Sequence, residues 1–244
     1  MARVWWAGFL IATLTFGAAA AVAQQRSFVA CPIVRDTKTV PCYLAEYQGQ
    51  TYYLGSQQDA GPAFQLPQLK HQVLVEGKVA GNVAEGPKVC GGIPLQPVSI
   101  SVIKEVNLAC STLLPPEPGV EAPAARPVQA APKQAGPEFT ILFMFDDDSL
   151  AGEGAQIATD AAAFAQRTGA RKVTVVGYRA ASLLSNGQQL VEKAGIAGQR
   201  AQAVAALLRG LGVKGVATES KDDAQPSDGA GDPARRRVTI SIGD

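Results

Sequence analysis

A proline-rich segment in the middle of the chain limits what the chain can fold into more than any other feature. Residues 115–137 read PPEPGVEAPAARPVQAAPKQAGP, with seven prolines among alanines and few bulky apolar side chains. Such a segment cannot build a core, and it favours an extended, semi-rigid conformation. We therefore expect a linker at 115–137 between two separately folded units, which a chain of 244 residues is long enough to supply.

The N-terminus has the three-part pattern of a secretory signal. Arg3 supplies a positive charge, an apolar run extends from Val4 to Ala21, and Ala21-Val22-Ala23 fits the small-x-small rule for cleavage. This order predicts that residues 1–23 are a signal peptide removed on export. A retained anchor and a lipoprotein acylated at Cys31 are the alternatives. The run is marginal for crossing a bilayer, which takes about 20 apolar residues, and polar residues interrupt the approach to Cys31.

Charge and motif content exclude several classes of function. The chain has 22 Lys and Arg against 21 Asp and Glu, so it offers no strongly basic surface for nucleic acid. His71 is the only histidine, and the sequence contains no H-E-x-x-H, G-x-S-x-G or P-loop pattern. We expect a non-enzymatic protein without cofactor or metal. No later stretch is apolar enough to predict a transmembrane segment after signal cleavage.

Four cysteines, all before the linker, fit an exported protein. An even number of cysteines in an oxidising compartment indicates two disulfides. Three connectivities are possible. We expect Cys31–Cys42 and Cys90–Cys110, because each pair flanks a compact β segment. The C-x-x-C spacing is absent, so neither a thioredoxin-like redox site nor a zinc knuckle is indicated.

The first unit, residues 31–114, is predicted to be a small β domain. Its candidate strands, separated by Gly and Pro turn signals, are 42–47, 50–54, 71–80 and 97–108. Gln48-Gly49 is suited to a hairpin turn between the first two. Short strands of this kind indicate a small barrel or sandwich, with an OB-like barrel as one option. Its tyrosines, Tyr43, Tyr47, Tyr52 and Tyr53, could form a stacking surface for sugar or peptide. We favour the alternative that tyrosine simply suits strands.

The second unit, residues 138–244, alternates strands and helices. Strands are predicted at 139–145, 172–177, 213–218 and 237–242, and helices at 152–168 and along an apolar stripe from Leu190 to Leu211. Gly195 and Gly198 within that stripe indicate either close packing on the sheet or a later helix start. The βαβαββ order predicts an α+β sandwich whose helices cover one face of a partly parallel sheet. Asp146 to Asp148 lack the spacing of a calcium loop and favour a turn before the following helix.

Four segments of this unit, in this order, resemble the OmpA-like peptidoglycan-associated domain family. They are ILFMFDDDSL at 141–150, KVTVVGY at 172–178, QRAQAVAALLRGLGV at 199–213 and ARRRVTISI at 234–242. The resemblance covers nearly all of 138–244 and none of the first unit. It implies a cell-envelope protein in the periplasm, with outer-membrane association as a further option.

The resemblance also implies a ligand site with one half missing. In that family an Asp and an Arg bind the amine and the carboxylate of diaminopimelate in the peptidoglycan stem peptide. Arg200 matches the family arginine, but Ala180 stands where the aspartate should be, and Arg179 and Tyr178 replace the Thr and His before it. Loss of one partner of a buried charge pair typically costs roughly 2–5 kcal/mol in binding. The nearest acid is Glu192.

Two functions therefore stay open from the sequence. One is structural attachment to peptidoglycan through a weakened or altered site, with Arg200, Arg179 and Tyr178 as the candidate contacts and with Arg179 and Arg200 as a hypothetical anion site. The other is a periplasmic protein-interaction scaffold with a vestigial peptidoglycan site, whose partner is another envelope protein.

Overall fold

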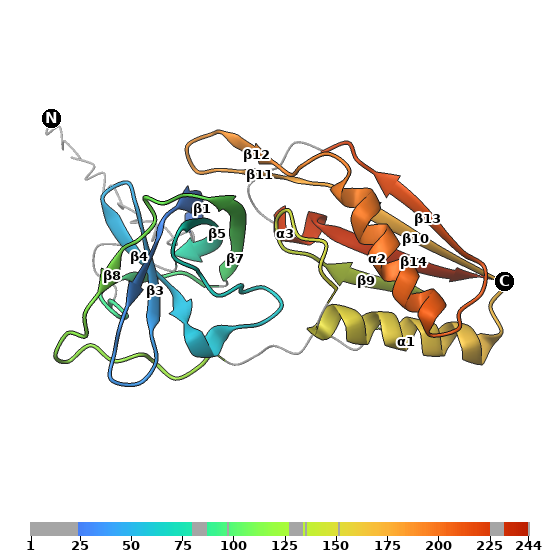
Figure 1. The fold of residues 1–244 in the computed structure, drawn as a ribbon, viewed down its shortest axis with the longest axis horizontal. Helices are drawn as coiled ribbons and strands as arrows, with labels where there is room; N and C mark the ends of the chain where they lie inside the picture. Colours follow the sequence, from blue (N-terminus) through green and yellow to red (C-terminus); the bar gives the residue numbers. More distant parts are fainter. Residues whose placement is uncertain are drawn as a thin grey trace, which may run out of the picture.

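The computed structural model describes residues 24–79, 87–96, 98–126, 134, 136–150, 152–224 and 232–243. The predicted signal peptide at 1–23 lies outside the described residues. Figure 1 shows two units side by side, one built of strands and one of strands covered by helices. We call residues 24–114 the β domain and residues 138–243 the C-terminal domain. None of the helices in the described ranges is long and apolar enough to cross a membrane.

The β domain consists of two antiparallel-rich sheets. One has the order β1-β5-β7 and the other the order β6-β4-β3-β2-β8. The strands are β1 (Gln24–Ala30), β2 (Pro32–Arg35), β3 (Cys42–Tyr47), β4 (Gln50–Ser56), β5 (His71–Val79), β6 (Ile93–Pro94), β7 (Val98–Val106) and β8 (Leu113–Leu114). β1 and β2 are separated only by Cys31, so one nearly continuous segment belongs to both sheets. Among the described residues no ladder of strand pairs closes the two sheets into a barrel, so the OB-like option stays a prediction.

The predicted hairpin and the structural interpretation of its tyrosines are confirmed. β3 and β4 pair antiparallel up to Tyr47 and Gln50. Gln48 and Gly49 between them both have positive φ, at 51° and 72°, as a type I′ turn requires. Three of the four tyrosine side chains are buried in the core of the domain, and Tyr47 stacks on the buried ring of Phe28. The buried rings of Tyr43, Tyr52 and Tyr53 are not accessible for stacking on a ligand.

The disulfide connectivity differs from the prediction. The bridges join Cys31 to Cys110 and Cys42 to Cys90, with Cα–Cα distances of 4.8 and 6.5 Å. The predicted pairing was wrong because it assumed that each bridge closes a local segment. Cys31 directly follows β1, which pairs with β5, and the N–H of Lys70, directly before β5, donates to the Cys110 carbonyl. Strand pairing therefore brings together cysteines that are far apart in sequence.

The first half of the predicted linker packs on the β domain. Val120 and Ala122 contact the small apolar cluster around Cys42 and Cys90. The Arg126 N–H donates to Asp59 Oδ1 at 2.8 Å, and Glu117 forms an ion pair with Arg35. Residues 115–126 contain no helix or strand, as expected, but they are held in place by the β domain.

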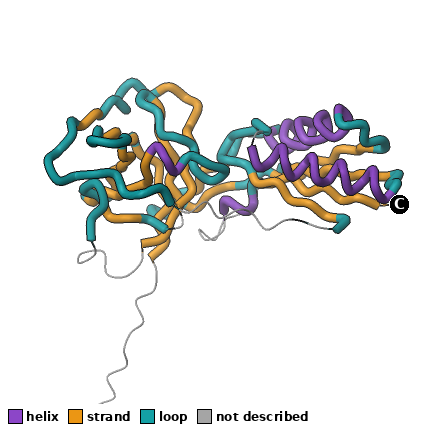
Figure 2. The backbone as a smooth tube through the Cα atoms, turned by 90° about the horizontal axis from the view of Figure 1, so that it is seen from below, coloured by secondary structure: helices purple, strands orange, loops and turns teal. Residues whose placement is uncertain are grey.

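The C-terminal domain has the predicted α+β architecture. Its main sheet has the order β13-β10-β14-β9, in which β10 and β13 are parallel and the other neighbours are antiparallel. Figure 2 shows both long helices on one face of this sheet. The elements are β9 (Glu138–Leu142), α1 (Gly152–Thr168), β10 (Lys172–Tyr178), β11 (Ala181–Leu183), β12 (Gln189–Val191), α2 (Ile196–Gly210), β13 (Val216–Lys221), α3 (Asp232–Arg235) and β14 (Arg237–Gly243). The hairpin β11–β12 and the short α3 are additions to the predicted βαβαββ order.

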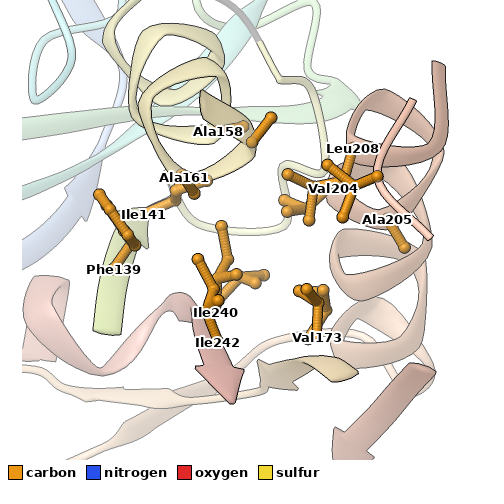
Figure 3. Packing of buried hydrophobic residues seen from close by; sticks show 14 of the residues in the cluster. Phe139, Ile141, Ala158, Ala161, Val173, Val204, Ala205, Leu208, Ile240 and Ile242 are labelled. Carbon is orange, nitrogen blue, oxygen red and sulfur yellow. The ribbon is translucent and has the colours of Figure 1, made fainter. Parts of the chain in front are cut away.

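Small side chains on the helices bring them close to the sheet. Four alanines of α1 are buried, and α2 contributes Ala201, Val204, Ala205 and Leu208 to the same cluster. Figure 3 labels five of them, Ala158, Ala161, Val204, Ala205 and Leu208, together with Ile240, Ile242 and Val173 of the sheet. The sheet supplies the larger apolar volume, and the alanines fill the remaining space without forcing the layers apart.

Helix α2 begins later than its apolar stripe. Leu190 lies in β12, and Gly195 precedes the helix in a left-handed conformation, with φ of 82°. The structure thus bears out the later helix start. A residue other than glycine would be strained at this φ.

Gly177 of β10 is required for close packing of α2. A Cβ at this position would lie 1.9 Å from the Ala197 carbonyl oxygen. Gly177→Ala should therefore destabilise the protein by about 1–3 kcal/mol, measured as the free energy of unfolding in urea. Gly198→Ala, within α2 itself, is the matched control. Its Cβ would meet its nearest neighbour only at 4.0 Å, so it should stabilise the helix by up to about 1 kcal/mol. Equal effects of both substitutions would contradict the packing argument.

Candidate ligand site

Arg200, the residue that matches the family arginine, is completely buried. It lies on the second turn of α2, and its side chain reaches the loop that follows β9. Its guanidinium and the carboxylate of Glu192 are both 0% exposed and form a two-pronged ion pair. Nη1 donates to Oε2 at 3.0 Å and Nη2 to Oε1 at 2.5 Å. Planar, bidentate pairs of this kind are among the stronger hydrogen bonds in proteins.

The remaining donors of Arg200 bind backbone carbonyls. Nε donates to the carbonyl of Asp147 at 2.8 Å, Nη1 to that of Tyr178 at 3.1 Å and Nη2 to that of Met144 at 2.8 Å. A guanidinium has five N–H donors, and these three bonds with the two to Glu192 engage them all. No donor of Arg200 is left to bind an external ligand in this conformation.

Glu192 is satisfied as completely as its partner. Oε2 accepts the Ala180 N–H at 2.8 Å, and Oε1 accepts the Asp146 N–H at 3.0 Å. Glu192 directly follows β12, so the hairpin β11–β12 places it over Arg200. Four hydrogen bonds offset the cost of burying a carboxylate. The anion that Arg200 holds is therefore a side chain of the same chain.

Arg179 and Tyr178 are not brought to Arg200 as ligand contacts. Arg179 Nε donates to the Glu192 carbonyl at 2.7 Å and Nη1 to the Asp222 carbonyl at 3.1 Å. The Tyr178 side chain extends from β10 on the side opposite to Gly177, whose α-carbon faces α2. Its ring lies 4.4 Å from the Arg237 guanidinium. Only the backbone of Tyr178 belongs to the Arg200 network, and the hypothetical Arg179–Arg200 anion site already contains Glu192.

Ala180, which the resemblance aligns with the aspartate of OmpA-like domains, contributes only its backbone to this network. Ala180 is buried, and its backbone N–H donates to Glu192. Glu192, the nearest acid in the sequence, pairs with the arginine and does not replace the missing aspartate. No group of three His, Cys, Asp or Glu side chains that could hold a metal occurs among the described residues.

Asp146 is the acid beside this ion pair whose pKa is shifted. Burial raises the pKa of its carboxyl above the ordinary value of 3.8, and the nearby charges of Glu192 and Glu105 add to this effect, against a hydrogen bond from the Lys193 N–H that lowers it. Its backbone φ is 51°, in the left-handed region. Asparagine tolerates that region well and keeps the Oδ1 acceptor.

Asp146→Asn should therefore raise the stability of the protein at neutral pH. A carboxyl with a raised folded pKa binds its proton more tightly in the native state, so the wild type loses stability as pH rises from the unfolded value through the folded one. The gain of the variant should be full above the folded pKa and should vanish below pH 3.8. Urea unfolding at several pH values measures it, with the more exposed Asp148→Asn as control. A gain that is independent of pH would contradict this account.

Comparisons with known proteins add the following. No known family model matches the chain, and no curated protein matches it significantly. Among solved structures, the OmpA-like domain of FopA1 from Francisella tularensis is 23% identical, with a TM-score of 0.33, over 45% of this chain and 75% of that one. The periplasmic domain of Helicobacter pylori MotB is 19% identical, with a TM-score of 0.35, over 43% and 81%. The cell wall anchor of the T6SS from Pseudomonas aeruginosa is 24% identical, with a TM-score of 0.34, over 43% and 80%. Each of these three likenesses to OmpA-like, MotB and cell-wall-anchor domains covers less than half of this chain.

Proposed function

We propose that this chain is a non-enzymatic cell-envelope protein of the periplasm, in which an OmpA-like domain serves as an interaction module and, while Arg200 is paired with Glu192, does not hold the peptidoglycan stem peptide through Arg200. The observation that carries the proposal is the buried Glu192–Arg200 ion pair, in which every guanidinium donor is engaged. A ligand carboxylate would have to displace a carboxylate that already has ideal geometry. An incoming amine would find the Ala180 methyl group where the family has an acid.

Co-sedimentation of the mature protein with purified peptidoglycan sacculi tests this proposal. The wild type should stay in the supernatant under conditions in which the Pseudomonas cell wall anchor pellets. Wild-type protein that pellets with sacculi, and that free meso-diaminopimelate releases from them, would overturn the proposal.

A second candidate, attachment to peptidoglycan through an altered site, is favoured by the position of Arg179. Its side chain binds the backbone of Glu192 next to the Arg200–Glu192 ion pair and, within the described chain, donates to backbone carbonyls and not to a carboxylate. If this candidate is correct, the wild type should pellet with sacculi and Arg179→Ala should reduce the pelleted fraction. Glu219→Gln, at an exposed position of β13, should not.

A further inference from the structure

Two segments form the walls around the Arg200–Glu192 ion pair, and both contact the β domain. One wall is the loop 143–148, whose Met144 and Asp147 carbonyls accept from Arg200. The other is segment 180–192, which contains the hairpin β11–β12 and ends in Glu192. In Figure 1 this hairpin extends from the C-terminal domain toward β1, β5 and β7.

The hairpin wall is fixed to the β domain by a second buried ion pair. Glu76 of β5 binds Arg236, which directly precedes β14, with Nη2 to Oε2 at 2.5 Å and side chains that are 2% and 1% exposed. Ser182 of β11 joins the pair, donating from Oγ to Glu76 Oε1 at 2.9 Å and accepting from Arg236 Nη1 at 2.9 Å. At the hairpin tip, Ser185 donates its N–H to the Ser27 carbonyl and accepts the Ser27 N–H on Oγ.

The loop wall is fixed to the β domain as well. The Phe145 N–H donates to Ser101 Oγ of β7 at 3.0 Å. Gln65 Nε2 donates to Asp147 Oδ2 at 3.1 Å, and Lys104 Nζ lies 3.5 Å from Asp147 Oδ1. Asp147 therefore binds the β domain through its side chain and Arg200 through its carbonyl.

Polar groups dominate these contacts between the two domains. The large apolar clusters of the described residues are separate, one in the C-terminal domain and others in the β domain. Polar inter-domain interfaces resemble transient ones, because their groups can be hydrated when the domains part. Such an interface can open while these apolar clusters stay packed.

We propose that the β domain is an internal cover that keeps the Arg200 pocket closed, and that its detachment frees the hairpin, moves Glu192 away and makes Arg200 available to a carboxylate-bearing ligand. This inference rests on the proposed function, since it explains how the internally filled pocket is kept in that state. Ser182 and Ala180 are two residues apart on the same segment. Release of Ser182 from Glu76 therefore loosens the Ala180 N–H group, which donates to Glu192.

Amide hydrogen exchange of the full mature chain tests the proposal, with Glu76→Gln and Glu76→Lys as variants. Lysine places a second positive charge against Arg236, so the interface cannot stay closed. The interface amides of Phe145 and Ser185 report opening, and the amides of Ala180 and Asp146, which donate to Glu192, report the pocket. In Glu76→Lys all four should exchange at least about tenfold faster, while the central-sheet amides of Val175 and Ile240 stay protected. Glu46→Lys, an exposed acid in β3, is the matched control.

The outcomes separate this inference from the proposed function. Faster exchange at Phe145 and Ser185 with unchanged protection at Ala180 and Asp146 would overturn the inference, because the pocket would then close without the β domain. Loss of protection at Val175 and Ile240 would indicate that Glu76→Lys unfolds the C-terminal domain. In that case Ser185→Ala, which removes only the hydrogen bond from the Ser27 N–H, replaces it, and the same amides are compared. Free meso-diaminopimelate should bind the opened variant and not the wild type. Wild-type binding to sacculi would count against the proposed function alone.

Discussion

Replacing Glu192 with alanine should destabilise the protein by about 3–5 kcal/mol, because it leaves the fully buried guanidinium of Arg200 without a counter-charge. Two backbone N–H groups, those of Ala180 and Asp146, lose their acceptor at the same time. The free energy of unfolding in urea measures the loss. Glu219→Ala is the matched control, since this glutamate is exposed on β13 and should change stability by no more than about 0.5 kcal/mol.

Acetate should restore part of the stability that Glu192→Ala loses. The truncated side chain leaves a space lined by Arg200 and the two N–H groups, and a small carboxylate can fill it. A ligand that binds only the native state raises stability as its concentration exceeds the dissociation constant. The unfolding temperature of the variant should therefore rise with acetate and level off, beyond the effect of chloride at equal ionic strength. A loss below about 1 kcal/mol, with no preference for acetate, would show that the ion pair is not the centre of the site.

The elements that the sequence predicts well are those with strong local patterns. Helix α1 has the predicted bounds, and β10 and β14 differ by one residue at one end, because an amphipathic helix and buried strands leave a clear periodicity. The hairpin β11–β12 leaves no such signal. Each of its strands has three residues, and its position depends on Ser182 and Ser185 contacting the β domain. Leu190 matched the helical stripe by spacing alone.

The sequence singles out residues of the candidate site but not how they are arranged. On the resemblance alone, Arg200 is the expected ligand contact and Ala180 the position of a missing acid, and both roles stay predictions. Nothing in the spacing of Glu192 indicates that it closes the pocket, because that follows from the hairpin before it. The Glu76–Arg236 pair is separated by 160 residues in sequence. A contact of this kind has no local pattern and is found only in the folded chain.

Removal of either disulfide should have the other large effect on stability. The chain-entropy estimate depends on the sequence separation of the two cysteines, which is 79 for Cys31–Cys110 and 48 for Cys42–Cys90. Loops of this length correspond to a loss of about 4 kcal/mol for each bridge replaced by two serines. The small cores of the β domain offer little to compensate. Urea unfolding of the two double-serine variants, with the reduced wild type for comparison, measures the loss.

The connectivity itself can be tested with the same preparation, because trypsin separates all four cysteines. Cleavage after lysine and arginine places Cys31 in peptide 27–35, Cys42 in 39–70, Cys90 in 89–104 and Cys110 in 105–133. Digestion without reductant should yield 27–35 linked to 105–133 and 39–70 linked to 89–104. A link between 27–35 and 39–70 would instead restore the local pairing. It would also lower the expected loss to about 3 kcal/mol per bridge, because the enclosed loops would be short. The masses of the linked peptides and the stability loss on bridge removal therefore test the connectivity independently. Linked peptides 27–35 with 105–133 and 39–70 with 89–104, together with a loss of about 4 kcal/mol per bridge, would both indicate that the bridges connect distant parts of the β domain.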